Sequence, residues 1–111
     1  MGNYQNGHST VFYHGTRAAF RPGGWLLSGL GVAKNYEASP GDRVFVTTNF
    51  AMAKIYAIAA KGRGGPRVLV VEPMSRLVPD GPDGDQYSLD MAKVVSVVLP
   101  RDWDKPQSVL Y

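Results

Sequence analysis

Hydrophobic residues along the chain fall into short runs that are separated by polar turns. Several of these runs are rich in β-branched or aromatic side chains, a composition typical of β-strands. Five runs stand out as strands, and they cover residues 11–14, 25–27, 43–47, 67–72 and 93–99. The fourth run does not alternate between apolar and polar residues, so we expect this strand to be buried on both faces. Overall, the pattern predicts about five or six short strands.

One segment has the pattern of an α-helix. Residues 50–61 are rich in alanine and are followed by Gly62. The side chain of Thr48 or Asn49 is expected to cap the first turn, and Lys61 suits the negative end of the helix dipole. Gly62 suits a left-handed stop. Two adjacent apolar faces are expected, one with Met52, Tyr56 and Ala59 and one with Ala51, Ile55 and Ile58.

Glycine and proline set the organisation of the chain. Thirteen glycines and eight prolines favour short strands joined by many turns. Together with the single helix, this pattern predicts the α+β class, with a core made mainly of strands. A length of 111 residues corresponds to one domain. We expect a flexible leader over residues 1–10, a single domain over residues 11–111, and an acidic loop over residues 79–88.

Composition excludes several kinds of chemistry. The chain has no cysteine, which excludes a disulfide framework, a thiolate zinc site and a cysteine nucleophile. Its two histidines, His8 and His14, are too few for a histidine-rich metal site, so we expect no metal. The net charge of +3 comes from scattered basic residues, which favour a solvated surface over a nucleic-acid footprint. A mild positive charge suits an anionic small molecule such as a dinucleotide.

The apolar runs are too short for a membrane-spanning helix, which needs about 18 to 20 residues. The first residues also lack the basic and apolar regions of a signal peptide. We therefore expect a cytoplasmic protein, although a toxin domain delivered into a target cytoplasm would have the same features.

Three groups of residues are candidates for chemistry, and each also has a structural explanation. His14 precedes Gly15, and this pair would expose a ring and a bare backbone, or form a core histidine beside a turn. Phe45 and Tyr56 would bracket a planar heterocycle, or pack in the core. The carboxylates would stabilise a cation or accept a proton, or form turns beside glycine and proline; they are Glu72, Asp80, Asp83 and Asp85.

Six short segments form an ordered series along the chain: Tyr13-His14-Gly15-Thr16-Arg17, Leu27-Ser28-Gly29, Asn35-Tyr36-Glu37, Arg43-Val44-Phe45-Val46-Thr47, Gly62-Arg63-Gly64 and Val71-Glu72-Pro73. The series resembles the small rifamycin ADP-ribosyltransferase family, whose motifs include an opening Tyr-x-His-Gly-Thr and a Val-Glu-Pro strand end. The resemblance spans roughly residues 12–103. It implies a compact ADP-ribosyltransferase-like fold, with short strands in a split β-sheet core and one main helix.

The resemblance also implies a binding site for NAD as co-substrate. His14 would bind the ribose next to the nicotinamide, and the backbone of Gly15 would bind the nicotinamide amide. Thr16 would support the turn. Phe45 falls where the family has a tyrosine packed on the nicotinamide, and Tyr56 falls at the spacing of a second stacking tyrosine.

Two residues would take part in catalysis by the same resemblance. Asp80 falls where the family has its functional aspartate, seven residues after the pair Glu72-Pro73. His14 is the second. Glu72 ends a strand, where a structural role is expected. Cleavage of the nicotinamide–ribose bond develops positive charge on the sugar, and a nearby carboxylate stabilises that charge.

The expected function is therefore transfer of ADP-ribose from NAD to a hydroxyl acceptor, a pentosyl transfer. The acceptor would be a small molecule such as a rifamycin antibiotic, and the biological role antibiotic resistance. Two alternatives stay open. A toxin-type transferase would modify protein or nucleic acid and have an antitoxin or immunity partner. A non-catalytic module would only bind NAD or ADP-ribose.

Overall fold

The computed structural model describes residues 10–28 and 43–105. These residues form seven β-strands, one α-helix and a short 3₁₀ helix. In chain order the elements are β1 (Phe12–Thr16), β2 (Trp25–Leu27), β3 (Val44–Thr47), α1 (Phe50–Ala59), β4 (Arg67–Pro73), β5 (Val78–Pro79), β6 (Gln86–Leu89), β7 (Met91–Val98) and η1 (Pro100–Asp102). The predicted α+β class is confirmed. The expected leader and the segment Asn35-Tyr36-Glu37 lie outside the described residues.

All strand pairs are antiparallel, and the sheet has the order β2-β7-β4-β1-β3-β6-β5. The joint between β1 and β3 is the weak point of this sheet. Every residue of β1 has a partner in β4, whereas β1 and β3 share one pair, Tyr13 and Thr47. The sheet therefore opens between its middle strand, β1, and the neighbouring β3, which is the split expected for the core.

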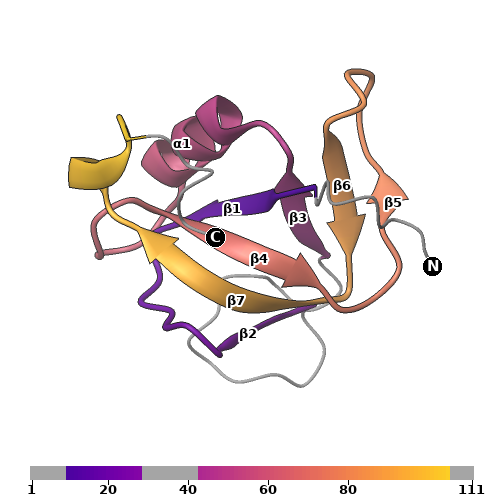
Figure 1. Ribbon diagram of the computed structural model, residues 1–111, viewed down its shortest axis with the longest axis horizontal. Helices are drawn as coiled ribbons and strands as arrows, with labels where there is room; N and C mark the ends of the chain where they lie inside the picture. Colours follow the sequence, from indigo (N-terminus) through magenta and orange to yellow (C-terminus); the bar gives the residue numbers. More distant parts are fainter. Residues whose placement is uncertain (1–9, 29–42, 106–111) are drawn as a thin grey trace.

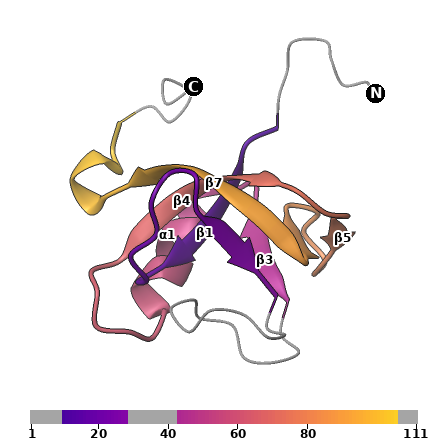
Figure 2. The same cartoon turned by 90° about the horizontal axis from the view of Figure 1, so that it is seen from below.

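Apolar side chains fill both sides of the sheet. Leu69 and Val71 belong to one buried cluster, while Val68 and Val70 belong to a second cluster beneath α1. All four side chains are almost completely buried. Strand β4 is therefore covered on both faces, as its unbroken apolar run predicts. Figures 1 and 2 show α1 lying next to β1, and Figure 1 shows a short turn joining it to β3.

Helix α1 begins as expected but ends earlier and buries a different face. The side chain of Asn49 accepts a hydrogen bond from the backbone amide of Met52, with 3.2 Å between the atoms, so Asn49 is the cap. The helix ends at Ala59, and the next residue, Ala60, is extended. The helix therefore does not run on to Lys61 and stop at Gly62, as the sequence predicts. Ala53 and Ala57 form the buried face.

Neither apolar face expected from the helical period is therefore the buried one. Ile55 and Ile58 are more than half exposed, at 55% and 56%. The physical reason is close backbone packing. A Cβ atom on Gly15 of β1 would lie 2.6 Å from the amide nitrogen of Ala57, and closer still to the carbonyl oxygen of Ala53. Only small residues allow a helix to approach a strand so closely.

Two predicted boundaries are also corrected. Strand β1 continues through Gly15 to Thr16, because both residues pair with β4. The acidic loop is shorter than residues 79–88, because Pro79 belongs to β5 and Gln86 begins β6. The turn over residues 80–85 contains two glycines with positive φ, Gly81 and Gly84. These residues connect β5 and β6 into a β-hairpin where the sequence predicts a loop.

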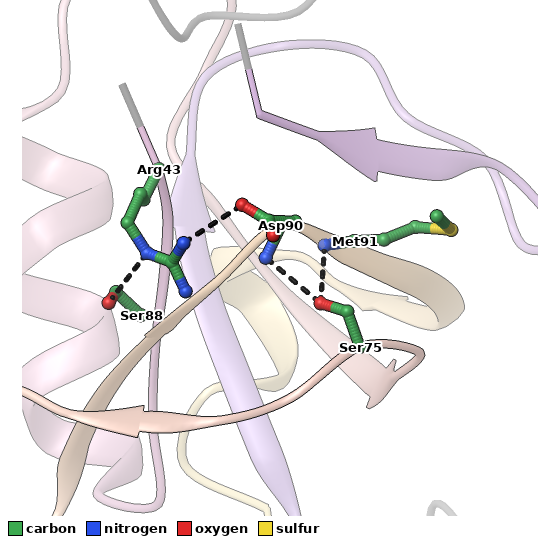
Figure 3. Close-up of polar contacts among 5 residues, drawn as sticks. All are labelled: Arg43, Ser75, Ser88, Asp90 and Met91. Atoms are coloured by element: carbon green, nitrogen blue, oxygen red, sulfur yellow. Dashed lines mark hydrogen bonds and ion pairs between the residues drawn. The ribbon is translucent and has the colours of Figure 1, made fainter. Parts of the chain in front are cut away.

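A polar cluster fixes the strand ends farthest from this hairpin turn (Figure 3). Arg43 precedes β3, and its guanidinium donates hydrogen bonds to Ser88 Oγ at 3.0 Å and Asp90 Oδ1 at 2.9 Å. The hydroxyl of Ser75 accepts from the backbone amides of Asp90 and Met91. These contacts hold β3, β6 and the β6–β7 turn together, so the β3–β6 pair forms a rigid wall.

Within residues 10–28 and 43–105, no helix has the length and apolar character needed to cross a membrane.

Candidate active site

A pocket of about 380 Å³ lies where β1 and β3 separate. This volume falls within the range of roughly 300 to 1,000 Å³ that is usual for small-molecule sites. Strands β1 and β3, helix α1, the β5–β6 turn and β6 each supply lining residues. They are His14, Gly15, Phe45, Tyr56, Asp80 and Gln86. Segments distant in sequence therefore meet at the opening of the sheet.

His14 spans this opening. Its Nδ1–H donates a hydrogen bond to the carbonyl oxygen of Phe45, with 2.7 Å between the two atoms. This side-chain bond lies next to the single backbone pair that joins β1 to β3. Because the carbonyl only accepts, Nδ1 carries the proton of this hydrogen bond. His14 thus holds the split strands at a fixed separation.

Gly15 brings the main chain of β1 into the pocket wall. The absence of a side chain allows α1 to pack on β1, as the close approach of Ala53 and Ala57 demonstrates. Gly15 also lines the pocket, so its main chain forms part of the pocket wall. One glycine therefore serves helix packing and pocket shape together.

Two aromatic side chains face the pocket from different elements. Phe45 is 46% exposed, whereas Val44 and Val46 on the opposite face of β3 are buried. Tyr56 comes from α1, and its hydroxyl donates a hydrogen bond of 2.6 Å to Gln86 Oε1. The helix brings Tyr56 to the strand that carries Phe45, as the sequence suggested.

Asp80 and Gln86 form the acidic side of the pocket. The backbone amide of Asp80 donates to the carbonyl oxygen of Gln86 at 2.8 Å, which closes the hairpin. The Gln86 side chain also donates from Nε2 to Asp80 Oδ2 at 3.4 Å. The sequence pattern does not single out Gln86, because this residue falls within the expected loop over residues 79–88. The two Asp-Gly pairs before it, at Asp80 and Asp83, were the available signal for a hairpin.

The other candidate residues lie outside the pocket lining. Thr16 is completely buried, and its hydroxyl accepts from the backbone amide of Ala18 at 3.0 Å, which supports the turn after β1. Asp85 binds the start of α1, since its carboxylate accepts from Asn49 Nδ2 at 3.4 Å. Glu72 is exposed on β4, and Asp83 is exposed in the hairpin turn.

The motif residues around the helix end have structural functions. The Arg17 guanidinium donates to the carbonyl oxygens of Ile58 at 2.8 Å and Gly64 at 3.1 Å. It therefore places positive charge at the C-terminal end of α1, where the helix dipole is negative. A Cβ atom on Gly64 would overlap the carbonyl oxygen of Arg17. The Gly62-Arg63-Gly64 turn is thus fitted against the end of β1.

The pocket is suited to a planar, electron-poor ligand. Among the residues that line it within 10–28 and 43–105, Asp80 is the one acidic residue, and none is lysine or arginine. Aromatic faces and a carboxylate both favour positive charge. In the described part of the chain, no cluster of three histidine, cysteine, aspartate or glutamate side chains could hold a metal ion.

An antiparallel sheet that opens over such a pocket defines a small α+β domain with a candidate small-molecule site at the split. Comparison with known families then identifies it: the chain belongs to the rifampin ADP-ribosyl transferase family, which matches residues 12–88. This range includes all six residues that line the pocket. The resemblance seen in the sequence is confirmed, and the match supports an ADP-ribosyltransferase enzyme. No individual curated protein matches the chain significantly.

Proposed function

We propose that the protein transfers ADP-ribose from NAD to a hydroxyl group of a rifamycin-type antibiotic. The family match supports the reaction class. The observation that carries the proposal is the pocket at the sheet opening, where the described lining residues include two aromatic side chains and one carboxylate and no lysine or arginine. The nicotinamide ring of NAD is planar and cationic, so it suits this surface.

The proposed reaction breaks the bond between the nicotinamide nitrogen and the ribose carbon. The bonding electrons go to the ring nitrogen, and nicotinamide leaves as a neutral molecule. The ribose carbon gains positive charge and forms a new bond with the acceptor oxygen, whose proton is released. A pocket that accepts positive charge before and during this step lowers the barrier.

Five of the lining residues have a proposed part in this step. Phe45 and Tyr56 hold the nicotinamide ring between them, and the main chain at Gly15 binds its amide group. His14 binds the adjacent ribose, and Asp80 stabilises the ribosyl cation and orients or deprotonates the acceptor hydroxyl. The family resemblance and the pocket together support these assignments, since all five residues line one cavity.

The test is to incubate the protein with NAD and rifampin, to measure NAD consumption, and to identify products by mass spectrometry. We expect free nicotinamide and rifampin that carries one ADP-ribose group. Binding of NAD without its consumption would favour a non-catalytic module instead. Modification of added protein or nucleic acid, with rifampin unchanged, would favour a toxin-type transferase.

Substitution of His14 tests whether its function is chemical or structural. We expect His14→Ala to lower turnover by about 10-fold or more, typical of losing a group that positions a reactant. His14→Asn is the matched control, because its amide retains a donor near Nδ1 for the Phe45 carbonyl but lacks Nε2. Equal losses of turnover in both variants support ligand binding by the imidazole ring. Full activity of the asparagine variant would mean that His14 only links β1 to β3 through its hydrogen bond to Phe45.

A further inference from the structure

Gln86 connects two sides of the pocket. Its Oε1 atom is 2.6 Å from the hydroxyl of Tyr56 on α1, and its Nε2 atom is 3.4 Å from Oδ2 of Asp80 on the hairpin turn. The side chain is partly buried and lines the same cavity as both partners. The side-chain amide of Gln86 therefore connects Tyr56, which is proposed to hold the nicotinamide ring, to the carboxylate of Asp80.

The direction of both hydrogen bonds is determined by chemistry. An ionised carboxylate only accepts, so the NH₂ group of Gln86 faces Asp80. Its carbonyl oxygen then faces Tyr56, and the tyrosine hydroxyl must donate to it. Asp80 thus fixes which end of the amide points at Tyr56, and the three side chains form one ordered chain of donors and acceptors.

Asp80 and Gln86 lie on different kinds of backbone structure. Asp80 lies in a turn between Pro79 and Gly81. The φ angle of Gly81 is +95°. Gln86 lies on a regular strand, where it pairs with Thr47 of β3, and its carbonyl oxygen accepts from the backbone amide of Asp80. Groups on strands are held more precisely than groups on turns. The strand residue is therefore suited to position the turn residue.

From this geometry we infer that Gln86 is a positioning residue for the ADP-ribosyl transfer: it orients the Asp80 carboxylate toward the ribose and couples that orientation to Tyr56. The inference rests on the proposed function. Gln86 binds one carboxylate oxygen and leaves the other for the substrate. Its contribution is exerted through Asp80 and vanishes when that carboxylate is removed.

The kinetic test uses Gln86→Met, which keeps the length and volume of the side chain but removes both hydrogen bonds. We expect kcat to fall about 10- to 100-fold, because misplacing a catalytic group by an ångström has an effect of this size. The KM for NAD is expected to change less than about threefold, since the carboxylate acts mainly in the transition state.

A double-variant cycle separates positioning from general damage. In an Asp80→Ala background, Gln86→Met is expected to lower kcat by less than about threefold, because the residue through which it acts is gone. The same loss in both backgrounds would overturn the inference, as would wild-type kcat in the single variant. Thermal unfolding of each variant shows whether the fold is retained.

A spectroscopic measurement tests the contact without relying on turnover. The side-chain amide signal of Gln86 in ¹H–¹⁵N NMR is assigned by its disappearance in Gln86→Met. We expect this signal to shift in both Asp80→Ala and Tyr56→Phe, and a signal unmoved in both variants overturns the inference. If the wild-type protein does not consume NAD, the proposed function fails, and the amide signal still decides where Gln86 is held.

Discussion

Asp80 differs from its acidic neighbours because the β5–β6 turn folds back onto the start of β6. Its backbone and its carboxylate both contact Gln86 in the pocket wall. Asp85 instead binds Asn49 at the start of α1, and Glu72 is exposed on β4. Although these carboxylates are close in sequence, the structure gives them different surroundings, and of the three only Asp80 is among the described residues that line the pocket.

Alanine substitution of the four carboxylates tests this assignment. We expect Asp80→Ala to lower the transfer rate about 10²-fold or more, with a smaller change in NAD affinity, because the charge acts chiefly in the transition state. Asp83→Ala and Glu72→Ala serve as exposed controls and should remain close to wild-type activity. Transfer at the wild-type rate by Asp80→Ala, together with an inactive but folded Glu72→Ala, would move the assignment to Glu72.

Phe45 offers a test of the ring-binding wall. Its side chain is nearly half exposed in the pocket, and the family resemblance places a tyrosine there. We expect Phe45→Tyr to raise NAD cleavage by about fivefold, the equivalent of one hydrogen bond of about 1 kcal/mol. Phe45→Leu keeps an apolar side chain but removes the aromatic ring, so this variant should cleave NAD more slowly. Reduced cleavage by Phe45→Tyr would mean that the pocket is fitted to phenylalanine.

Among the secondary structure elements, the packing of α1 on β1 controls the shape of the pocket. Gly15 allows the helix backbone to approach the strand, and Tyr56 is carried on that helix between Ala53 and Ala57. The capping side chain of Asn49 and the Arg17 contacts fix the two ends of α1. Displacement of the helix would therefore move a pocket wall.

Substituting Gly15 by alanine tests this coupling. The new Cβ would meet backbone atoms of Ala53 and Ala57, so α1 must shift. We expect the free energy of unfolding to fall by about 1 to 3 kcal/mol, as in other overpacked cores, and NAD turnover to fall with it. Gly65→Ala is the control, because a Cβ atom there has no neighbour within 4 Å. Equal stability of the two variants in chemical denaturation would contradict close helix packing.

At the scale of the whole molecule, the core beneath α1 contains an ionisable group. Tyr13 is 7% exposed, and its ring packs edge-on against Phe50 with centroids 5.1 Å apart. Burial raises the pKa of the Tyr13 hydroxyl, because the interior disfavours its charged form. The unfolded chain therefore releases this proton at a lower pH than the folded chain does.

The sign of the pH effect follows from the direction of that shift. Below about pH 10 the tyrosine is protonated in both states, and its contribution to stability is fully present. As the pH rises beyond this value, only the unfolded state loses the proton, so the free energy of unfolding falls. We expect a smaller alkaline decrease in Tyr13→Phe, measured by chemical denaturation between pH 9 and pH 11. Identical pH slopes in the two proteins would contradict the effect.

The amino-acid sequence by itself determined the features that depend on near neighbours. The unbroken apolar run at 68–71 predicts a strand covered on both faces, and a cap at Thr48 or Asn49 predicts the helix start, because burial pattern and capping are local properties. The tertiary structure decided which helix face is buried, since Ala53 and Ala57 are selected by Gly15 on another element. It also decided the contact of Gln86 with Asp80 and Tyr56. That contact depends on where the paired strands separate, which is a property of long-range strand register and not of any local pattern.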